Sequence, residues 1–288
     1  MSSSNNTTIV NSGSKKSAGS LLRSPRYSYE YTHDSSVVSK KSAATAVILF
    51  VVGTSMTCEA YSDLAANCAS GQSTVFVVVD NNPGNIVKLS GKDTATVFND
   101  IVANITNSLG DIIASSPAIF IGGHSAGGYS AIEAMKVNGG NLSFTPAGYI
   151  GADPLGRDGG VPSMKIDVPT FAMGFTVETC QVTLNQAGMA AYNVTTNISN
   201  RVMMQVINNS DRGNQITHCI FTTGGCAFCP SHDAGAWVRQ VIGKFNSLFV
   251  NSIVKGFKTN KRNYEGAIGD EYKSLVNVFY GEEAATLP

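Results

Sequence analysis

The chain has 288 residues, of which 43% are hydrophobic and 14% are charged, and its 20 Lys and Arg residues balance its 20 Asp and Glu residues. This length and apolar content suffice for one large domain with a sizeable core. The sparse, balanced charge excludes the broad basic surface that binds nucleic acid, so the composition favours a small or apolar partner.

The N-terminal segment, residues 1–25, consists mostly of Ser, Asn, Thr, Gly and Lys. It has few large apolar side chains to offset the entropy of ordering, so we expect a disordered tail. The motif YSYEY at 27–31 alternates with a period of two, which is typical of an edge strand. We expect a single folded domain over residues 26–255 and a solvated C-terminal extension, with the polar stretch KTNKRNYEG, over residues 256–288.

The stretch KKSAATAVILFVVGTSMTCEA at 40–60 imitates a signal peptide, with lysines, then an apolar run, then small residues. The apolar run is too short to span a bilayer, and it starts well inside the chain. We therefore interpret residues 46–53 as a buried strand. Six cysteines, an even number, and several Asn-x-Ser/Thr sequences still favour an oxidising, secretory-type route.

From residue 45 onward, apolar runs rich in β-branched residues alternate with segments of helical periodicity. Strands that are buried on both faces have the composition of these runs. The runs lie at 46–53, 74–80, 117–123, 146–153, 168–175 and 201–207. The helical segments lie at 57–69, 93–109, 126–137 and 234–254. The alternation predicts an α/β fold in which a mostly parallel central sheet carries helices on both faces.

Residues 123–127 read Gly-His-Ser-Ala-Gly and fit the motif G-x-S-x-G between a strand and a helix. In this setting the serine occupies a sharp, strained turn at the carboxyl end of the sheet, above the N-terminus of the next helix. Glycines surround such a turn where the backbone needs unusual angles or close approach. Ser125 is therefore the candidate nucleophile, and the alternative is a glycine-rich turn with an idle serine.

A serine hydroxyl needs a base within hydrogen-bond reach and an acid that orients the base, in the chain order Ser, Asp or Glu, His. Asp153 closes the apolar run YIGAD and is the favoured acid, with Glu178 after the next run as the alternative. His218 follows the last apolar run and is the favoured base over His232, which starts the final helix.

Acyl transfer also needs backbone N–H groups that point at the oxyanion. One is expected from Ala126, the residue after the candidate nucleophile. The other is expected from the loop after the first core strand, where Thr54 and Ser55 follow Gly53, and the choice between these two residues stays open.

These motifs carry a resemblance to a known family. The stretches VILFVVGTSMTCEAYSDLAANCASGQSTVFVVVD, GGHSAGG, YIGADPLGRDGG and HCIFTTGGCAFC resemble the chlorophyllases in order and spacing over residues 45–254. Chlorophyllases are α/β-hydrolases that cleave the phytyl ester of chlorophyll to chlorophyllide and phytol. The resemblance implies an α/β-hydrolase fold, with Ser125, Asp153 and His218 as the triad, and a plastid location.

The chain departs from that family at three places. Val52 and Gly53 stand where the family has His-Gly, and Ala126 stands where an arginine is common. After His218, the stretch CIFTTGG replaces the acidic run of the family. A serine ester hydrolase needs no cofactor or metal, and the expected partner is an apolar, chlorophyll-like ester reached by peripheral association with a membrane.

Three other interpretations remain. The first is a lipase or esterase for a different apolar ester, because a near-neutral composition suits any hydrophobic substrate. The second is a metal or redox module: Cys219, Cys226, Cys229 and His232 could bind zinc, or Cys226 and Cys229 could cycle as a dithiol. The simpler alternative is a disulfide that braces the loop beside His218. The third is a pigment or lipid carrier without catalysis. Cys58 and Cys68, ten residues apart, could also form a disulfide.

Overall fold

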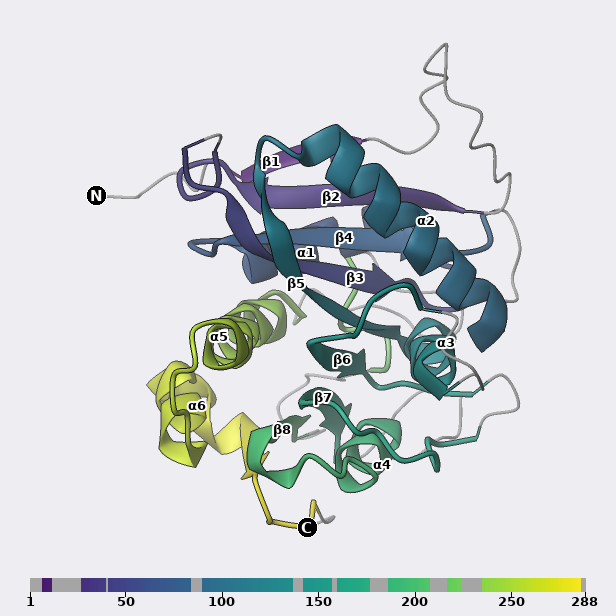
Figure 1. Ribbon diagram of the computed structural model, residues 1–288. Coiled ribbons are helices and arrows are strands. Elements are labelled where there is room, and N and C mark those ends of the chain that lie inside the picture. Colours follow the sequence, from purple (N-terminus) through teal and green to yellow (C-terminus); the bar gives the residue numbers. More distant parts are fainter. Residues whose placement is uncertain are drawn as a thin grey trace.

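The computed structural model describes residues 7–11, 27–39, 41–83, 90–136, 142–156, 160–176, 186–207, 217–223 and 235–285. Within these residues, nine strands form one sheet in the order β1-β2-β4-β3-β5-β6-β7-β8-β9 (Figure 1). The strands are β1 (Thr7–Asn11), β2 (Ser28–Asp34), β3 (Ala44–Val51), β4 (Thr74–Asp80), β5 (Ile113–His124), β6 (Gly148–Ala152), β7 (Thr170–Phe175), β8 (Arg201–Val206) and β9 (Val276–Tyr280).

The helices are α1 (Ser62–Ala69), α2 (Gly91–Leu109), α3 (Ser125–Lys136), α4 (Ala187–Asn193), α5 (Gly235–Val254) and α6 (Lys261–Ala267). Short 3-10 helices lie at η1 (Cys58–Tyr61), η2 (Ile198–Asn200) and η4 (Asp270–Leu275). None of the helices that the structure describes has both the length and the apolar character needed to cross a membrane.

The strand register brings the carboxyl ends of the central strands to one edge of the sheet. Neighbouring strands from β4 to β8 run parallel, and β1, β2 and β9 join antiparallel. Val51 of β3 lies opposite Gly123 of β5, and His124 lies opposite Ala152 of β6. The residues that follow these strands therefore emerge side by side at the same edge, which is where open α/β sheets bind ligands.

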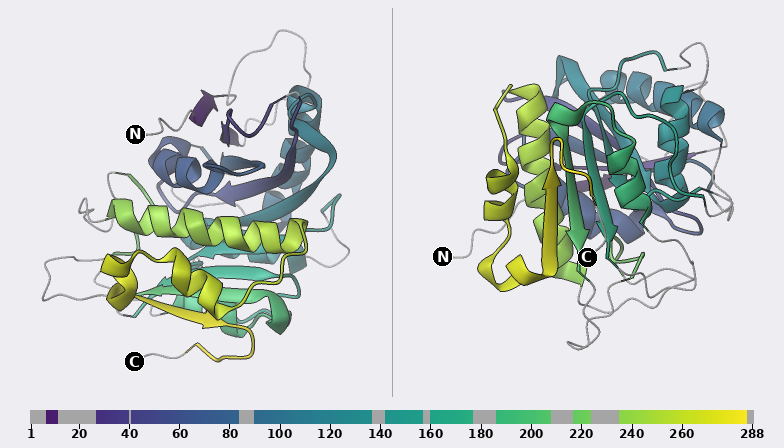
Figure 2. Two further views of the ribbon diagram at one scale, coloured as in Figure 1. Left: turned by 90° about the vertical axis from the view of Figure 1, so that its left-hand side faces the viewer. Right: turned by 90° about the horizontal axis from the view of Figure 1, so that it is seen from below.

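Two apolar cores cover the two faces of the sheet. Along β3, Ile48 and Phe50 point into the first core, and Val47 and Leu49 point into the second, as the period of two in a strand requires. The first core includes the apolar faces of α1 and α5, and the second includes those of α2 and α3. Figure 2 shows α5 and α2 on opposite faces of the sheet. The predicted α/β fold with a mostly parallel sheet is confirmed.

Most of the elements predicted between residues 27 and 254 are confirmed with boundary shifts of a few residues. The signal-like apolar run is β3, whose residues 46–51 are all buried in the middle of the sheet. A helix over 187–193 was not predicted, because its sequence AGMAAYN has no amphipathic repeat long enough to recognise.

The expected limits of the domain are wrong at both ends. Residues 7–11, expected within a disordered tail over 1–25, form β1 and pair with β2. Residues 256–285, expected within a solvated extension over 256–288, contain α6, η4 and β9, and β9 pairs with β8. The reason is non-local: Val276 and Val278 alternate with polar residues and become buried only against elements formed much earlier in the chain.

Candidate active site

Ser125 lies at the sharp turn between β5 and α3, as the motif predicts. β5 ends at His124 and α3 begins at Ser125, whose φ of 53° falls in the left-handed region. A non-glycine residue in this region costs about 1 kcal/mol or more and persists only where the surroundings impose it. Ser125 is largely buried at this turn, with 8% of the residue exposed.

The glycines around Ser125 allow close approach of backbone segments. A Cβ on Gly127 would lie 2.3 Å from the carbonyl oxygen of Val52, and a Cβ on Gly123 would lie 2.5 Å from that of Val51. These glycines have no positive φ, so the unusual backbone angle falls on the serine itself. The glycines let α3 pack directly against the end of β3, and this packing imposes the turn on Ser125.

Asp153 and His218 form a buried pair next to this turn. Asp153 follows β6, and its Oδ2 accepts a hydrogen bond of 2.6 Å from Nδ1 of His218. The second carboxylate oxygen, Oδ1, accepts a bond of 3.2 Å from the backbone N–H of Gly188 at the start of α4. Asp153 is 1% exposed and His218 is 5% exposed, so both bonds lie in a region of low dielectric. Asp153 is also held in the left-handed region, with φ of 44°.

The Asp153–His218 bond fixes the tautomer of the histidine. A carboxylate can only accept, so Nδ1 of His218 carries the hydrogen. In the neutral imidazole, the lone pair is then on the other ring nitrogen, Nε2. An imidazole held in this way can take a proton from a hydroxyl group, which is the role of the base in a serine triad.

The turn that carries His218 is held by side chains from distant elements. Arg239 of α5 donates from Nη1 to the carbonyl oxygens of Ile220 and Thr222, at 3.0 and 3.2 Å, and its Nε pairs with Asp63 of α1 at 2.5 Å. At the end of the turn, the N–H of Thr223 donates to the carbonyl oxygen of Ala60, at 2.7 Å. These bonds connect the turn directly to α5 and η1, and Arg239 connects it to Asp63 of α1.

His124, the residue before Ser125, is buried and bonded at both ring nitrogens. Its Nδ1 lies 2.6 Å from the hydroxyl oxygen of Tyr61, and its Nε2 lies 2.8 Å from the carbonyl oxygen of His218. Burial lowers the pKa of His124 well below its ordinary value, and the neighbouring His218 lowers it further. The two imidazole rings lie 4.5 Å apart between centroids, which brings the His218 ring alongside the residue next to Ser125.

The loop after β3 also lies against Ser125. A Cβ on Gly53 would lie 3.3 Å from Cβ of Ser125 and 2.9 Å from Nδ1 of His124. The N–H of Gly53 donates to Tyr61 at 2.9 Å. Thr54 and Ser55, the next two residues, have backbone N–H groups without a hydrogen-bond partner among the described residues.

The N–H of Ala126 belongs to the first turn of α3, where backbone donors have no partner within the helix. The structure thus brings Ser125, Ala126, the Thr54–Ser55 loop, Asp153 and His218 to one edge of the sheet.

Several alternatives from the sequence fall elsewhere. Glu178, His232, Cys226 and Cys229 lie outside the described residues. Cys219 is in a disulfide, which agrees with the bracing disulfide and removes this thiolate from a zinc site. No cluster of three or more His, Cys, Asp or Glu side chains suited to a metal occurs within the part of the chain that the structure describes.

Cys58 and Cys68 do not form the disulfide that their spacing allowed. Both thiols are free and buried, Cys58 at the start of η1 and Cys68 near the end of α1. Burial raises the pKa of the Cys58 thiol to about 12, so it stays protonated and packs as a small apolar group.

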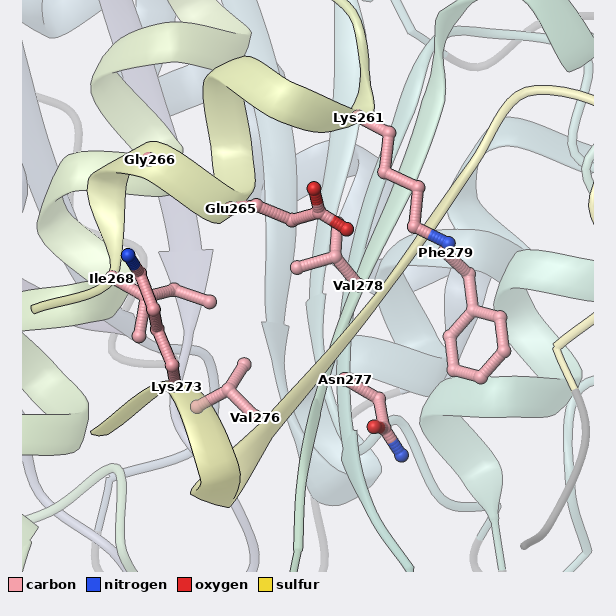
Figure 3. Close-up of a pocket in the computed structure, with 9 residues that line it drawn as sticks. All are labelled: Lys261, Glu265, Gly266, Ile268, Lys273, Val276, Asn277, Val278 and Phe279. Carbon is pink, nitrogen blue, oxygen red and sulfur yellow. The ribbon is translucent and has the colours of Figure 1, made fainter. Parts of the chain in front are cut away.

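A cavity of about 620 Å³ lies away from these residues, between α6 and β9 at the edge of the sheet (Figure 3). It is lined by Lys261, Glu265, Gly266, Ile268, Lys273, Val276, Asn277, Val278 and Phe279. Lys261 pairs with Glu283 and Lys273 pairs with Asp270, so both of its cations are already neutralised. This cavity contains no group of the Ser125 site.

The sequence did not point to Tyr61, His124 or Arg239 as parts of the site. For His124, the position inside the motif was the only available signal. For Arg239, the signal was a single charge among apolar residues of the predicted final helix. Searches of protein-family models and of curated proteins find no match to this chain, so its function has to be inferred from the geometry of the site.

Proposed function

We propose that the protein is a serine carboxylic-ester hydrolase with an α/β-hydrolase fold, in which Ser125, His218 and Asp153 form the triad. The observation that carries this proposal is the buried bond of 2.6 Å between Nδ1 of His218 and Oδ2 of Asp153, beside a serine in a strained strand-to-helix turn. Nucleophile, base and acid also follow one another in the chain order of that fold.

The reaction has two stages. Nε2 of His218 takes the proton of the Ser125 hydroxyl as its oxygen attacks the ester carbonyl, and then donates that proton to the departing alcohol. This leaves an acyl group on Ser125. His218 next takes a proton from water as the water oxygen attacks the acyl-enzyme, and it returns that proton to the Ser125 oxygen as the acid departs. Asp153 holds the tautomer and stabilises the imidazolium that forms in each stage.

The oxyanion of each tetrahedral intermediate is held by backbone donors. One is the N–H of Ala126 in the first turn of α3, where the helix dipole adds positive potential. The second is the N–H of Thr54 or Ser55, because the N–H of Gly53 is already bonded to Tyr61. This pair corresponds to the α/β-hydrolase arrangement, in which one donor follows the nucleophile and the other lies after strand β3.

The substrate that we propose is the phytyl ester of chlorophyll, cleaved to chlorophyllide and phytol. This proposal rests on the resemblance of four sequence stretches to the chlorophyllases, and it implies action in a plastid at a pigment-bearing membrane. Buried neighbours of the site such as Met56, Leu155 and Phe221 are apolar, which suits a hydrophobic ester. The second candidate substrate is another apolar ester, for which the same residues serve equally well.

The decisive experiment compares two substrates with one variant. Purified protein is incubated with chlorophyll a and, separately, with p-nitrophenyl butyrate, and the products are identified by chromatography and absorbance. We expect chlorophyllide from the first and p-nitrophenol from the second, and neither from Ser125→Ala. Hydrolysis of the short ester alone would favour the general esterase. Pigment binding without any hydrolysis would favour the carrier and overturn the enzyme.

The choice of acid is tested by two further variants. Asp153→Ala should lose nearly all hydrolysis of p-nitrophenyl butyrate, and Glu178→Ala should retain most of it. The opposite result would transfer the role of the acid to Glu178.

A further inference from the structure

A chain of buried hydrogen bonds joins the loop after β3 to the backbone of His218. It runs from the N–H of Gly53 to the hydroxyl of Tyr61 at 2.9 Å, then to Nδ1 of His124 at 2.6 Å. From Nε2 of His124 it continues to the carbonyl oxygen of His218 at 2.8 Å. Tyr61 is fully buried and His124 is 1% exposed, so these bonds are shielded from water.

The two ends of the chain, with a neutral His124, fix the direction of every bond. A backbone N–H can only donate and a backbone carbonyl can only accept. Tyr61 therefore accepts from Gly53, and Nε2 of His124 carries a hydrogen that it donates to His218. Burial lowers the pKa of His124, so the ring is neutral and its Nδ1 has no hydrogen. Tyr61 then donates its own hydrogen to Nδ1 of His124.

Both ends of this chain belong to the site. Gly53 directly precedes Thr54 and Ser55, which supply the second oxyanion donor in the proposed function. His218 carries the base, and its carbonyl group sets the position of its backbone. A shift of about 1 Å at either end is enough to lower a reaction rate about 100-fold.

We propose that Tyr61 and His124 are positioning residues, which hold the oxyanion loop and the His218 turn at a fixed separation through this hydrogen-bond chain. The inference rests on the proposed serine hydrolase function. Neither residue exchanges a proton with the substrate, because the direction of the chain leaves no free lone pair on the His124 ring.

The charge of His124 fits this role. The ring of His218 lies 4.5 Å from that of His124 and becomes a cation in each stage of the proposed reaction. A second cation at this distance would oppose that step. Burial and the neighbouring His218 lower the pKa of His124, so it stays neutral while His218 is charged.

A purely structural role would arise from ring packing alone. Tyr61 packs against Phe50 at 5.8 Å between centroids, and His124 packs against Phe221 at 5.1 Å. Tyr61→Phe keeps these ring contacts and removes only the hydroxyl group. The matched control is Tyr192→Phe, since Tyr192 is equally buried and donates a bond of 3.3 Å to the carbonyl oxygen of Gly281, away from the site.

The experiment uses two readouts on the full chain. The first is the rate of covalent labelling of Ser125 by a fluorophosphonate, together with kcat and KM for p-nitrophenyl butyrate. The second, which needs no activity, is hydrogen–deuterium exchange of the backbone in peptides that cover residues 52–57 and 217–223.

We expect Tyr61→Phe to lower kcat and the labelling rate by about 10- to 100-fold with little change in KM. We also expect faster exchange in both peptides, although the hydroxyl belongs to neither. Tyr192→Phe should match the wild type in both readouts. Unchanged labelling and exchange in Tyr61→Phe would overturn the positioning role while leaving the hydrolase in place.

Two substitutions of His124 each remove a different bond from the hydrogen-bond chain. In His124→Gln the amide nitrogen can reach the carbonyl of His218, and in His124→Asn the amide oxygen can accept from Tyr61. The increase in the exchange rate over the wild type should therefore be larger at 52–57 in His124→Gln and larger at 217–223 in His124→Asn. The same pattern in both variants would contradict a chain of discrete links.

Failure of the proposed hydrolase function would give a different result from failure of the positioning role. A wild-type protein that neither reacts with the fluorophosphonate nor hydrolyses an ester would overturn the catalytic half of the inference along with the hydrolase. Faster hydrogen–deuterium exchange in both peptides of Tyr61→Phe would then still show that the hydrogen-bond chain connects the two segments structurally.

Discussion

The turn at Ser125 and the turn at residues 217–223 hold their side chains in different ways. At Ser125 the constraint is steric: glycines let backbone segments approach so closely that a single Cβ would collide with the carbonyl oxygens of Val51 or Val52. At 217–223 the constraint is a set of hydrogen bonds: Arg239 and His124 donate to carbonyl oxygens of the turn, and the N–H of Thr223 donates to the carbonyl oxygen of Ala60 in η1. The first turn depends on glycines that have no side chain, and the second depends on hydrogen bonds from side chains far away in the sequence.

This difference decides which changes each turn tolerates. A crowded turn fails when atoms are added, and a bonded turn fails when atoms are removed. The two turns are connected through His124, which donates to the carbonyl oxygen of His218 and packs against Phe221. Each turn can still be tested by substitutions at its own glycines or hydrogen-bonding side chains.

The largest expected effect comes from the reacting groups themselves. Ser125→Ala and His218→Ala should each lower kcat for p-nitrophenyl butyrate by roughly 10⁴-fold or more, and the double variant should be no worse, because the residues act as a unit. Steady-state kinetics measure this, with circular dichroism to show that folding is intact. Ser130→Ala, a buried serine of the same helix that donates to the carbonyl oxygen of Gly127, serves as the control. Additive losses would contradict a shared mechanism.

The bonded turn should fail next, when Arg239 is removed. Arg239→Ala removes the Nη1 donor from the carbonyl oxygens of Ile220 and Thr222 and the ion-pair partner of Asp63. We expect the free energy of unfolding to fall by about 2 to 4 kcal/mol in chemical denaturation. Asp63→Asn should cost less, because the Asp63 side chain is 39% exposed and the bonds to the turn remain. Equal falls in the free energy of unfolding in the two variants would show that Arg239 stabilises the protein mainly through its ion pair with Asp63.

The crowded turn should fail when a methyl group is added. Gly127→Ala places a Cβ 2.3 Å from the carbonyl oxygen of Val52, which cannot rotate away, so we expect a loss of about 3 kcal/mol in the free energy of unfolding. The control is Gly266→Ala in α6, where a Cβ meets nothing within 4 Å. This control should gain about 0.5 to 1 kcal/mol from higher helix propensity. A stable, active Gly127→Ala variant would refute the steric account of the turn.

The smallest expected effect is on the pH dependence of stability. Burial lowers the pKa of His124 well below the ordinary histidine value of about 6.5, so below that pH the unfolded chain binds a proton that the folded protein does not. Stability should fall as the pH drops below about 6.5, with His124 contributing up to about 1.4 kcal/mol per pH unit. Unfolding of the wild type and of His124→Gln between pH 7 and pH 5 isolates this contribution. Parallel profiles would mean that His124 titrates normally.

The sequence predicted the parts of the molecule whose signals are local. Strands β3 to β8 contain apolar runs, and Ser125 and Asp153 directly follow the ends of two of them. His218 was predicted from its place after the last run. Tyr61 and Arg239 gave no such signal. Tyr61 bonds a residue 63 positions away, and Arg239 bonds one 176 positions away, so no local pattern connects the partners.

The same reason explains the errors at the two ends of the chain. The residues TTIVN of β1 and VNVFY of β9 are short and stand among polar neighbours, so their strand character depends on a partner strand that local periodicity does not reveal. The Cys58–Cys68 pairing failed because spacing along a helix says nothing about the direction of the two side chains.

The late position of β9 has a consequence for synthesis of the chain. β8 acquires its outer neighbour only when residues 276–280 are available, and Gln205 and its partner Asn277 are separated by 72 residues. At the usual speed of translation this interval lasts roughly 4 to 14 seconds. During that time the open edge of β8 can pair with another nascent chain. The yield of soluble protein should therefore depend on how well this edge is shielded in the cell that makes it.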